Sequence, residues 1–330
     1  MKWIGWLLPM PCAFVSYLPY LKKLDLKKFG LILAIFGSGL GFGFGSGAAM
    51  AEPFRFATWN IENFWHVAGE SLRGPYRGRD TIRLAGDYRA IRATIDRLDA
   101  HVWALQEMGS PAAAQFLFPA DQWHLVFSPR FDAQAGPKAQ ENRDIYTALA
   151  ISKDAASLIS THAIALDVSP GNRMGTAALL DIQGARLWVA SVHLKSGCRS
   201  DLPKTSDRQA CGVMAAQLPI LETWIDDRLD QGVLVGGDFN RTLVGYNSFQ
   251  PGDDPAWADL ADRDPGPILS FPFTPQVNCP EGQFGARTWP VDFVLASSAL
   301  AQSAHAGPYV QSMGGRALSD HCPVLVAFDL

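Results

Sequence analysis

Leu234-Val235-Gly236-Gly237-Asp238-Phe239-Asn240 joins a short apolar run to an acid and an amide through two glycines. An apolar run of this kind predicts a buried β-strand, which places Asp238 and Asn240 at its end. Glycines there let the backbone turn sharply and approach a ligand closely. A turn closed by the Asp side chain is the purely structural alternative for this stretch.

A second acid stands in Ser319-Asp320-His321, just before the apolar run 324–328. An Asp beside a His at a strand end suits metal-assisted phosphoester hydrolysis. The carboxylate can hold a cation or deprotonate water, while the imidazole neutralises charge on the phosphoryl oxygens. A further acid, Asp292, stands inside the apolar run 289–295. Because an unpaired buried carboxylate is costly, we expect His321 to be its partner.

Polar residues also end other predicted strands. Asn60 closes the first strand, Glu107 closes the second, and His193 follows an apolar, β-branched run. A carboxylate and an amide at adjacent strand ends would form an oxygen-rich site suited to Mg²⁺, Mn²⁺ or Ca²⁺. Each residue alone has a structural alternative, since Asn60 can cap a turn, Glu107 can form a surface ion pair and a lone His usually stabilises the fold.

The chain after residue 51 shows many short strands and few helices. Predicted strands cover 54–61, 102–105, 146–151, 177–182, 187–192, 233–235, 291–295 and 324–328. Helical periodicity covers 84–98 and 207–229, where Pro219 predicts a kink, and these helices are expected to cover a sheet. With 48% hydrophobic and 18% charged residues, and no Pro/Ser/Gly-rich linker in 52–330, we expect one α/β domain with a large core.

Residues 1–51 have the features of a signal peptide. Lysines at 22, 23, 27 and 28 precede an apolar, glycine-rich run, and Ala49-Met50-Ala51 fits a cleavage site. An apolar stretch at 3–21, interrupted by prolines, leaves an overlong leader, a later start or a retained membrane anchor as alternatives. Removing 1–51 takes away five lysines and one aspartate, so the net charge changes from −4 to −8. That acidity argues against coating nucleic acid or anionic membrane through bulk charge.

Four cysteines follow the predicted leader: Cys198, Cys211, Cys279 and Cys322. An even count in an exported protein favours disulfides, and the short spacing of Cys198 and Cys211 predicts one bridge. Cys279 with Cys322 would be the second, although four cysteines allow three pairings. A metal site is the alternative, but the sequence has no C-x-x-C spacing.

Taken together, the polar strand ends resemble the endonuclease/exonuclease/phosphatase superfamily, which includes deoxyribonuclease I, the abasic-site endonucleases and the neutral sphingomyelinases. The resemblance runs from about residue 54 to 328 and implies a four-layered α/β sandwich, in which two packed mixed sheets are flanked by helices and the site lies at one edge. The residues that carry it, in chain order, are Asn60, Glu107, His193, Asp238-x-Asn240, Asp292 and Asp320-His321.

The resemblance also implies roles. Glu107 would be the principal ligand of Mg²⁺, Mn²⁺ or Ca²⁺, with Asn60 in or near the coordination shell and Asp320 contributing. For the catalytic residues, it implies that His321 sits against the scissile phosphate, oriented by Asp292. Asp238 and Asn240 would position or deprotonate the attacking water, and His193 would donate to a phosphate oxygen, although its orienting acid is not identifiable from the sequence.

Two further residues match by position. Arg173 stands where family nucleases carry a phosphate-binding arginine, with a solvated loop arginine as the alternative, and Tyr146 is expected near the site unless it is a core residue. The expected chemistry is in-line attack of water on a phosphodiester with one divalent cation and no covalent enzyme intermediate.

Nucleic acid is the first expectation for the substrate. We expect an exported nuclease, periplasmic or extracellular, acting on DNA or RNA, with no obligate protein partner and membrane contact only through an uncleaved leader. Arginines 73, 77, 79 and 83 would track a nucleic-acid backbone or form a solvated face. Alternatives are a sphingomyelinase-type lipid phosphodiesterase, a phosphomonoesterase on small phosphates and, in another class, an inactive binding module.

Overall fold

The computed structural model describes residues 52–72, 82–135, 144–199, 203–243, 254–261, 269–270, 291–306 and 318–330. The chain divides into two compact units, Met1–Ala49 and Met50–Leu330, and all described residues belong to the second. The predicted signal peptide, Cys279 and Arg73, Arg77 and Arg79 lie outside the described residues.

One six-stranded sheet, sheet A, has the strand order β11-β12-β1-β2-β4-β3. Strands β1 and β2 run parallel, and the other neighbours are antiparallel. The carboxyl ends of β1 and β2 therefore meet at the same edge. Its strands are β1 (Phe54–Phe64), β2 (Val102–Met108), β3 (Trp123–Phe127), β4 (Tyr146–Ser152), β11 (Ala304–Ala306) and β12 (Val324–Phe328).

A second six-stranded sheet, sheet B, has the order β5-β6-β7-β8-β10-β9. Here β7 and β8 are the parallel pair, and the other neighbours are antiparallel. Each sheet thus has one central parallel pair. Its strands are β5 (Ser157–Ile164), β6 (Gly175–Ile182), β7 (Ala185–His193), β8 (Val233–Asp238), β9 (Leu269–Ser270) and β10 (Asp292–Ser297).

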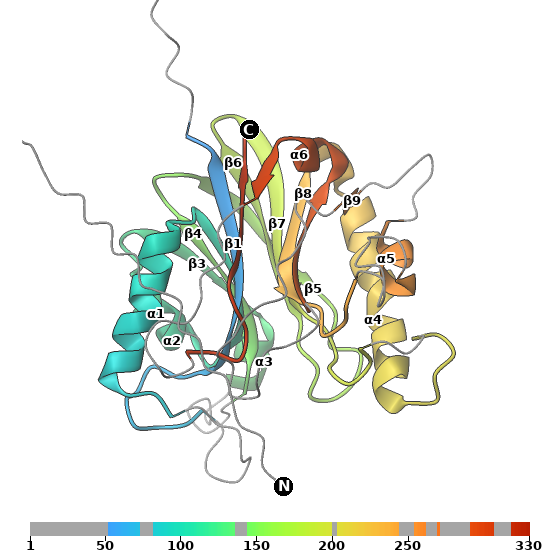
Figure 1. Ribbon diagram of the computed structural model, residues 1–330, viewed down its shortest axis with the longest axis horizontal. Helices are drawn as coiled ribbons and strands as arrows, with labels where there is room; N and C mark the ends of the chain where they lie inside the picture. Colours follow the sequence, from blue (N-terminus) through green and yellow to red (C-terminus); the bar gives the residue numbers. More distant parts are fainter. Residues whose placement is uncertain are drawn as a thin grey trace, which may run out of the picture. The chain divides into compact units, whose positions relative to one another are not determined.

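Helices cover the outer faces of both sheets (Figure 1). Helices α1 (Ala85–Leu98) and α2 (Pro111–Leu117) pack on sheet A, and α4 (Gln209–Asp226) and α5 (Pro255–Leu260) pack on sheet B. Shorter elements are α3 (Arg130–Ala135), α6 (Ser298–Gln302) and a 3-10 turn, η2 (Leu229–Gln231). The predicted four-layered sandwich is confirmed.

Three apolar layers fill the spaces between these four layers. Strand side chains alternate between faces, so one strand contributes to two cores. In β1, Phe56 packs between the sheets, whereas the next residue, Ala57, packs under the helices of sheet A. In β8, Leu234 likewise packs between the sheets and Val235 under α4. The layer between the sheets is the one that leads to the candidate site.

The predicted elements are all present. Most strands run further than predicted, whereas the helix predicted over 207–229 spans only Gln209–Asp226. Four strands were not predicted: β3, β5, β9 and β11. Most of β5 is exposed on the sheet edge, and β9 and β11 are two and three residues long, so none has a clear apolar alternation. Pro219 lies inside α4, which runs without interruption from Gln209 to Asp226. Among the described residues, no helix has the length and apolar character needed to cross a membrane.

Candidate active site

The space between the sheets changes from apolar to polar toward one edge. On β7, Leu187 and Val189 belong to the core between the sheets, and by alternation Ser191 and His193 continue the same face. On sheet A, Gln106 is fully buried and donates from Nε2 to Ser191 Oγ at 2.9 Å. This polar bridge joins the sheets directly beneath the candidate site.

Three predicted site residues form one row across sheet B. Asp238 pairs with His193 on one side and with Asp292 on the other. His193 Nε2 lies 3.4 Å from Asp238 Oδ2, and both side chains are buried. Asp238 is therefore the acid beside His193 that the sequence did not identify. Asp292 is the first residue of β10. Its apolar neighbours had predicted a position inside the strand.

The two glycines before Asp238 are required by close packing. A Cβ at Gly236 would lie 2.7 Å from Phe56 Cε1 and 2.9 Å from Thr58 Cβ on the facing sheet. A Cβ at Gly237 would lie 2.2 Å from the Val192 carbonyl oxygen. Since real Cβ atoms do not approach so closely, glycine is needed at both positions for β8 to bring Asp238 against sheet A.

Asn60 connects the two sheets at this edge. Its Nδ2 donates to Asp238 Oδ2 at 3.0 Å and to Glu107 Oε1 at 3.3 Å. Its Oδ1 accepts from the Glu62 main-chain N–H at 3.0 Å. Asn60 thus presents its amino group to the carboxylates and holds them together. Only Oδ1 of Asn60 can coordinate a cation. The predicted coordination therefore requires the side-chain amide to flip, which exchanges the positions of Oδ1 and Nδ2.

Backbone bends turn several side chains toward the site. Regular alternation would put Glu107 on the helix side, with Leu105, but the register of β2 shifts between Leu105 and Met108. Glu107 itself has φ +61°. Positive φ also occurs at Glu62, Asn63 and Asn240, so four of the six non-glycine residues with positive φ in the described part of the chain surround this site. Such costly conformations concentrate at functional sites.

His321 is the fixed centre of the C-terminal contribution. Its Nδ1 lies 2.7 Å from Asp292 Oδ2, which is the predicted pairing. Nε2 then faces Asp238 Oδ2 at 3.6 Å and Asp320 Oδ1 at 3.5 Å. Burial alone lowers the pKa of His321, but Asp292 and Asp238 outweigh it and raise the pKa to about 10. The imidazole is accordingly protonated at neutral pH.

Two predicted site residues, Arg173 and Asn240, hydrogen-bond to the loop that follows β7. Arg173 Nη2 donates to the Leu194 carbonyl at 2.6 Å, and Asn240 Nδ2 donates to the same oxygen at 3.0 Å. The Asn240 main-chain N–H donates to Asp238 Oδ1 at 2.8 Å. Asn240 therefore orients Asp238, and Arg173 anchors the loop beside it.

Tyr146 is a core residue beside the site. It is 1% exposed, and it pairs on sheet A with Met108, the residue after Glu107. Its ring packs against Phe127 and Phe131, with centroids 5.5 Å and 5.3 Å away. This agrees with the core alternative weighed for Tyr146 from the sequence.

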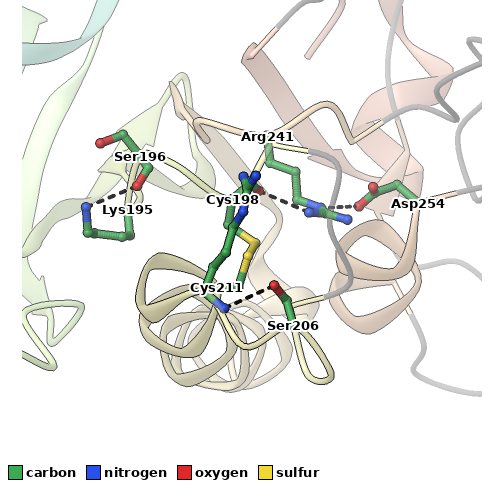
Figure 2. Close-up of a disulfide and its surroundings, with 8 residues drawn as sticks. Lys195, Ser196, Cys198, Ser206, Cys211, Arg241 and Asp254 are labelled. Atoms are coloured by element: carbon green, nitrogen blue, oxygen red, sulfur yellow. Dashed lines mark hydrogen bonds and ion pairs between the residues drawn. A yellow bond between two sulfur atoms is a disulfide. The ribbon is translucent and has the colours of Figure 1, made fainter.

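A disulfide joins Cys198 to Cys211, as the spacing predicted (Figure 2). The buried Arg241 donates from Nη1 to the Cys198 carbonyl at 3.1 Å and from Nε to Asp254 Oδ1 at 2.8 Å, which ties this loop to the segment after Asp238. Cys322, next to His321, is also disulfide-bonded.

Comparison of the sequence with protein families identifies the chain. The model of the endonuclease/exonuclease/phosphatase family matches residues 57–321. The chain belongs to this family. A comparison with curated protein sequences finds no match.

Solved structures of family members share the fold. Zebrafish (D. rerio) TDP2 complexed with single-strand DNA product has 17% identity and a TM-score of 0.55, with 83% of this chain and 98% of that chain covered. The human Nocturnin catalytic domain has 16% identity and a TM-score of 0.52, covering 84% and 94%. A family protein from Bacteroides thetaiotaomicron has 13% identity and a TM-score of 0.55, covering 83% and 95%.

The donor set of this family member fits a divalent cation. Carboxylate oxygens of Asp238 and Asp292 lie within 4.8 Å of each other and of a ring nitrogen of His321. Because the protonated imidazole has no lone pair for a cation, the carboxylates are the candidate ligands. Asp292 Oδ1 is buried and accepts no hydrogen bond in the described part of the chain. Buried carboxylate oxygens that gather without enough donors favour a hard cation nearby. Glu107, joined to Asp238 through Asn60, extends the same acidic group.

Proposed function

We propose that this family member is an exported, metal-dependent phosphodiesterase that cleaves nucleic acid by in-line attack of water. The observation that supports it most is the meeting of His193, Asp238 and Asp292 from sheet B with Asn60 and Glu107 from sheet A. These side chains surround one buried edge, and His321 completes the group. Acids and imidazoles in contact are the groups that phosphoester hydrolysis requires.

The predicted metal ligands fit this arrangement with one addition. Glu107 and Asp320 would hold Mg²⁺ or Mn²⁺, and the unpaired Oδ1 of Asp292 offers a further oxygen. A divalent cation bound there supplies positive charge against the phosphoryl oxygens. Asn60 keeps Glu107 and Asp238 close enough to share that charge.

The remaining steps fall to the protein's own side chains. Asp238 is fixed on both oxygens, by the Asn240 N–H on Oδ1 and by Asn60 on Oδ2, so it can receive the proton of an attacking water in a set orientation. His321 is held through Nδ1, so its Nε2–H can donate to a phosphoryl oxygen. His193 Nε2 lies 3.4 Å from Asp238 Oδ2. His193 stands on the side of Asp238 opposite Asp292 and can donate to another phosphoryl oxygen.

Nucleic acid is the proposed substrate for two reasons. The zebrafish protein with this fold was solved in complex with a single-strand DNA product. We propose the same class of substrate for this chain. An exported nuclease also suits the predicted leader and the Cys198–Cys211 disulfide, since disulfides persist in oxidising compartments. A sphingomyelinase-type lipid phosphodiesterase and a phosphomonoesterase remain the competing activities.

Nicking of supercoiled plasmid DNA tests the proposal. The purified protein would be incubated with Mg²⁺ and with Mn²⁺, beside an EDTA control and the Glu107→Ala variant. Nicking that requires the metal and is lost in the variant supports a nuclease. Folded protein that leaves DNA and RNA intact, yet hydrolyses sphingomyelin or inositol phosphates, overturns the nucleic-acid assignment. Inactivity on all of them would favour a binding module.

A further inference from the structure

Arg83 is a buried arginine just before α1, outside the residues predicted to act in catalysis. Only 1% of it is exposed, which rules out the backbone-tracking role considered for it from the sequence. Its Nη2 lies 2.8 Å from the Ile61 carbonyl oxygen, 2.9 Å from that of Glu62 and 2.8 Å from that of Leu318. One guanidinium nitrogen thus joins two segments that are more than 230 positions apart in sequence.

The charge of Arg83 is retained inside the protein. Burial lowers its pKa to about 10, with Glu62 foremost among the residues that oppose the decrease. The guanidinium is therefore protonated at neutral pH, and its carbon lies 5.5 Å from the centre of the Phe64 ring. A desolvated cation is costly in a core unless several oxygens surround it, as the three carbonyls do here.

The first segment that Arg83 binds carries the metal side of the site. Glu62 and Asn63, two and three residues after Asn60, adopt positive φ of +35° and +47°. The Asn63 N–H donates to Glu107 Oε2 at 2.8 Å, so the bend fixes the Glu107 carboxylate. Arg83 holds this bend through the carbonyls on either side of it, since its Nη1 also reaches the Asn63 oxygen at 3.5 Å.

The second segment carries the imidazole side. Leu318 precedes Ser319, whose hydroxyl donates to the Asn60 carbonyl at 2.6 Å. The same hydroxyl accepts from the His321 main-chain N–H at 3.0 Å. Arg83 and Ser319 therefore fasten the His321 loop to the end of β1 at two adjacent points.

We propose that Arg83 is a positioning residue: its guanidinium fixes the bend 61–63 against Leu318 and so sets the placement of Glu107 relative to His321. This inference rests on the proposed phosphodiesterase function. The bonds of Arg83 fall on both segments that bear on the site, the bend that fixes Glu107 and the loop that carries His321. Because a misplacement of about 1 Å costs about 100-fold in rate, this arrangement bears directly on catalysis.

The test compares Arg83→Met with Arg92→Met. Arg92 is a matched control on α1, since its guanidinium donates to the Phe116 carbonyl and lies 4.9 Å from the Phe116 ring, away from the site. Folding would be followed by circular dichroism, kcat and KM on plasmid or a dinucleotide phosphodiester, and cation affinity by direct Mn²⁺ titration. We expect Arg83→Met to lose about 100-fold in kcat with little change in KM, and at least about tenfold in Mn²⁺ affinity.

Arg83→Lys covers the case in which the methionine variant does not fold. Lysine keeps the charge, but its side chain is one atom shorter and lacks the second terminal nitrogen that reaches the Asn63 oxygen, so we expect a smaller loss in both measurements. Wild-type kcat and Mn²⁺ affinity in either folded Arg83 variant overturns the proposal, as do equal losses in Arg92→Met. Failure of both Arg83 variants to fold assigns the residue to folding alone and also overturns it. Wild-type protein without phosphodiesterase activity would instead overturn the proposed function, and the Mn²⁺ titration would still test Arg83.

Discussion

His193 and Asp238 are paired across the parallel strands β7 and β8, and their Nε2 and Oδ2 atoms lie 3.4 Å apart. Asp238 also touches Asn60 and approaches His321 Nε2 at 3.6 Å. One carboxylate therefore stands between two imidazoles and an amide from the other sheet. This arrangement gives His193 a defined orientation. It also gives each of the two histidines its own contribution to the reaction.

His193→Ala is expected to lower kcat by about 100-fold to 10,000-fold, the range for a positioned proton donor or acceptor. His305→Ala is the matched control. It removes another His–Asp pair, His305 Nε2 to Asp329 Oδ2 at 2.8 Å, which is exposed and includes a residue of the edge strand β11. Steady-state kinetics on a phosphodiester would measure both. Equal kcat values for the two variants would remove His193 from the mechanism.

Asp292 and His321 are expected to act as a unit. Single variants Asp292→Asn and His321→Ala should each lower kcat by several orders of magnitude, because the first leaves the imidazole unoriented and the second removes it. The double variant should lose much less than the product of the two single losses, because most of the effect of Asp292 passes through His321. A double-mutant cycle in kcat measures this coupling. Multiplicative effects would show that the 2.7 Å contact has no catalytic consequence.

The stability of metal-free protein should depend on pH through the same pair. The pKa of His321 is raised from 6.5 to about 10, so its protonated form stabilises the fold fully below pH 6.5. That contribution is lost as the pH rises through about 10. Urea unfolding in EDTA should show a decrease in the free energy of unfolding between pH 6.5 and 10 on the order of 1 kcal/mol or more, since one pKa unit corresponds to roughly that amount. Asp292→Asn should flatten the decrease, and an equal slope in both proteins would contradict the assignment.

The strands that carry the site and their polar ends follow from the sequence, because alternation and apolar runs indicate which segments and faces are buried. The order of the strands within each sheet does not follow from it. The same alternation carries His193, Asp238 and Asp292 to the face between the sheets. The partnership of Asp292 with His321 also follows, since a carboxylate next to a core needs a partner.

The sequence does not reveal effects that depend on irregular backbone. The register shift in β2 and the positive φ at Glu107 turn the Glu107 carboxylate away from the helix side. No local sequence pattern predicts either feature. Arg83 shows the same limit, since its neighbours in sequence suggest a basic surface, whereas its acceptors include the distant Leu318. Long-range main-chain contacts of this kind become visible only in the folded protein.

Gly236→Ala should destabilise the protein by about 1–3 kcal/mol through overpacking. The added methyl would lie 2.7 Å from Phe56, 2.9 Å from Thr58 and 3.0 Å from Ala104, all on the facing sheet. Gly212→Ala is the control, because a Cβ there meets nothing within 4 Å and the residue lies in α4. We expect that change to be neutral or stabilising, since alanine favours helices. Urea midpoints distinguish the two, and equal midpoints would contradict the close packing of the sheets.

Cys198 and Cys211 close a loop that follows β7. Replacing both cysteines by serine should cost about 3 kcal/mol, because the bridge closes a loop with a sequence separation of 13. The site should nevertheless keep its rate within about threefold, since the loop has independent anchors near the site. Leu194 accepts from Arg173 and Asn240, and the Lys195 N–H donates to the buried Gln217 at 2.9 Å.

Urea unfolding and kcat at 25 °C, measured on the same preparation, separate the two effects of this double serine variant. A loss of stability with retained kcat is the expected result. A folded variant with kcat reduced more than about tenfold would show that the hydrogen bonds to Leu194 and Lys195 are too weak to hold the loop alone. Orientation of Asn240, and through it of Asp238, would then depend on the covalent bridge, because the Asn240 N–H is a direct donor to the Asp238 carboxylate.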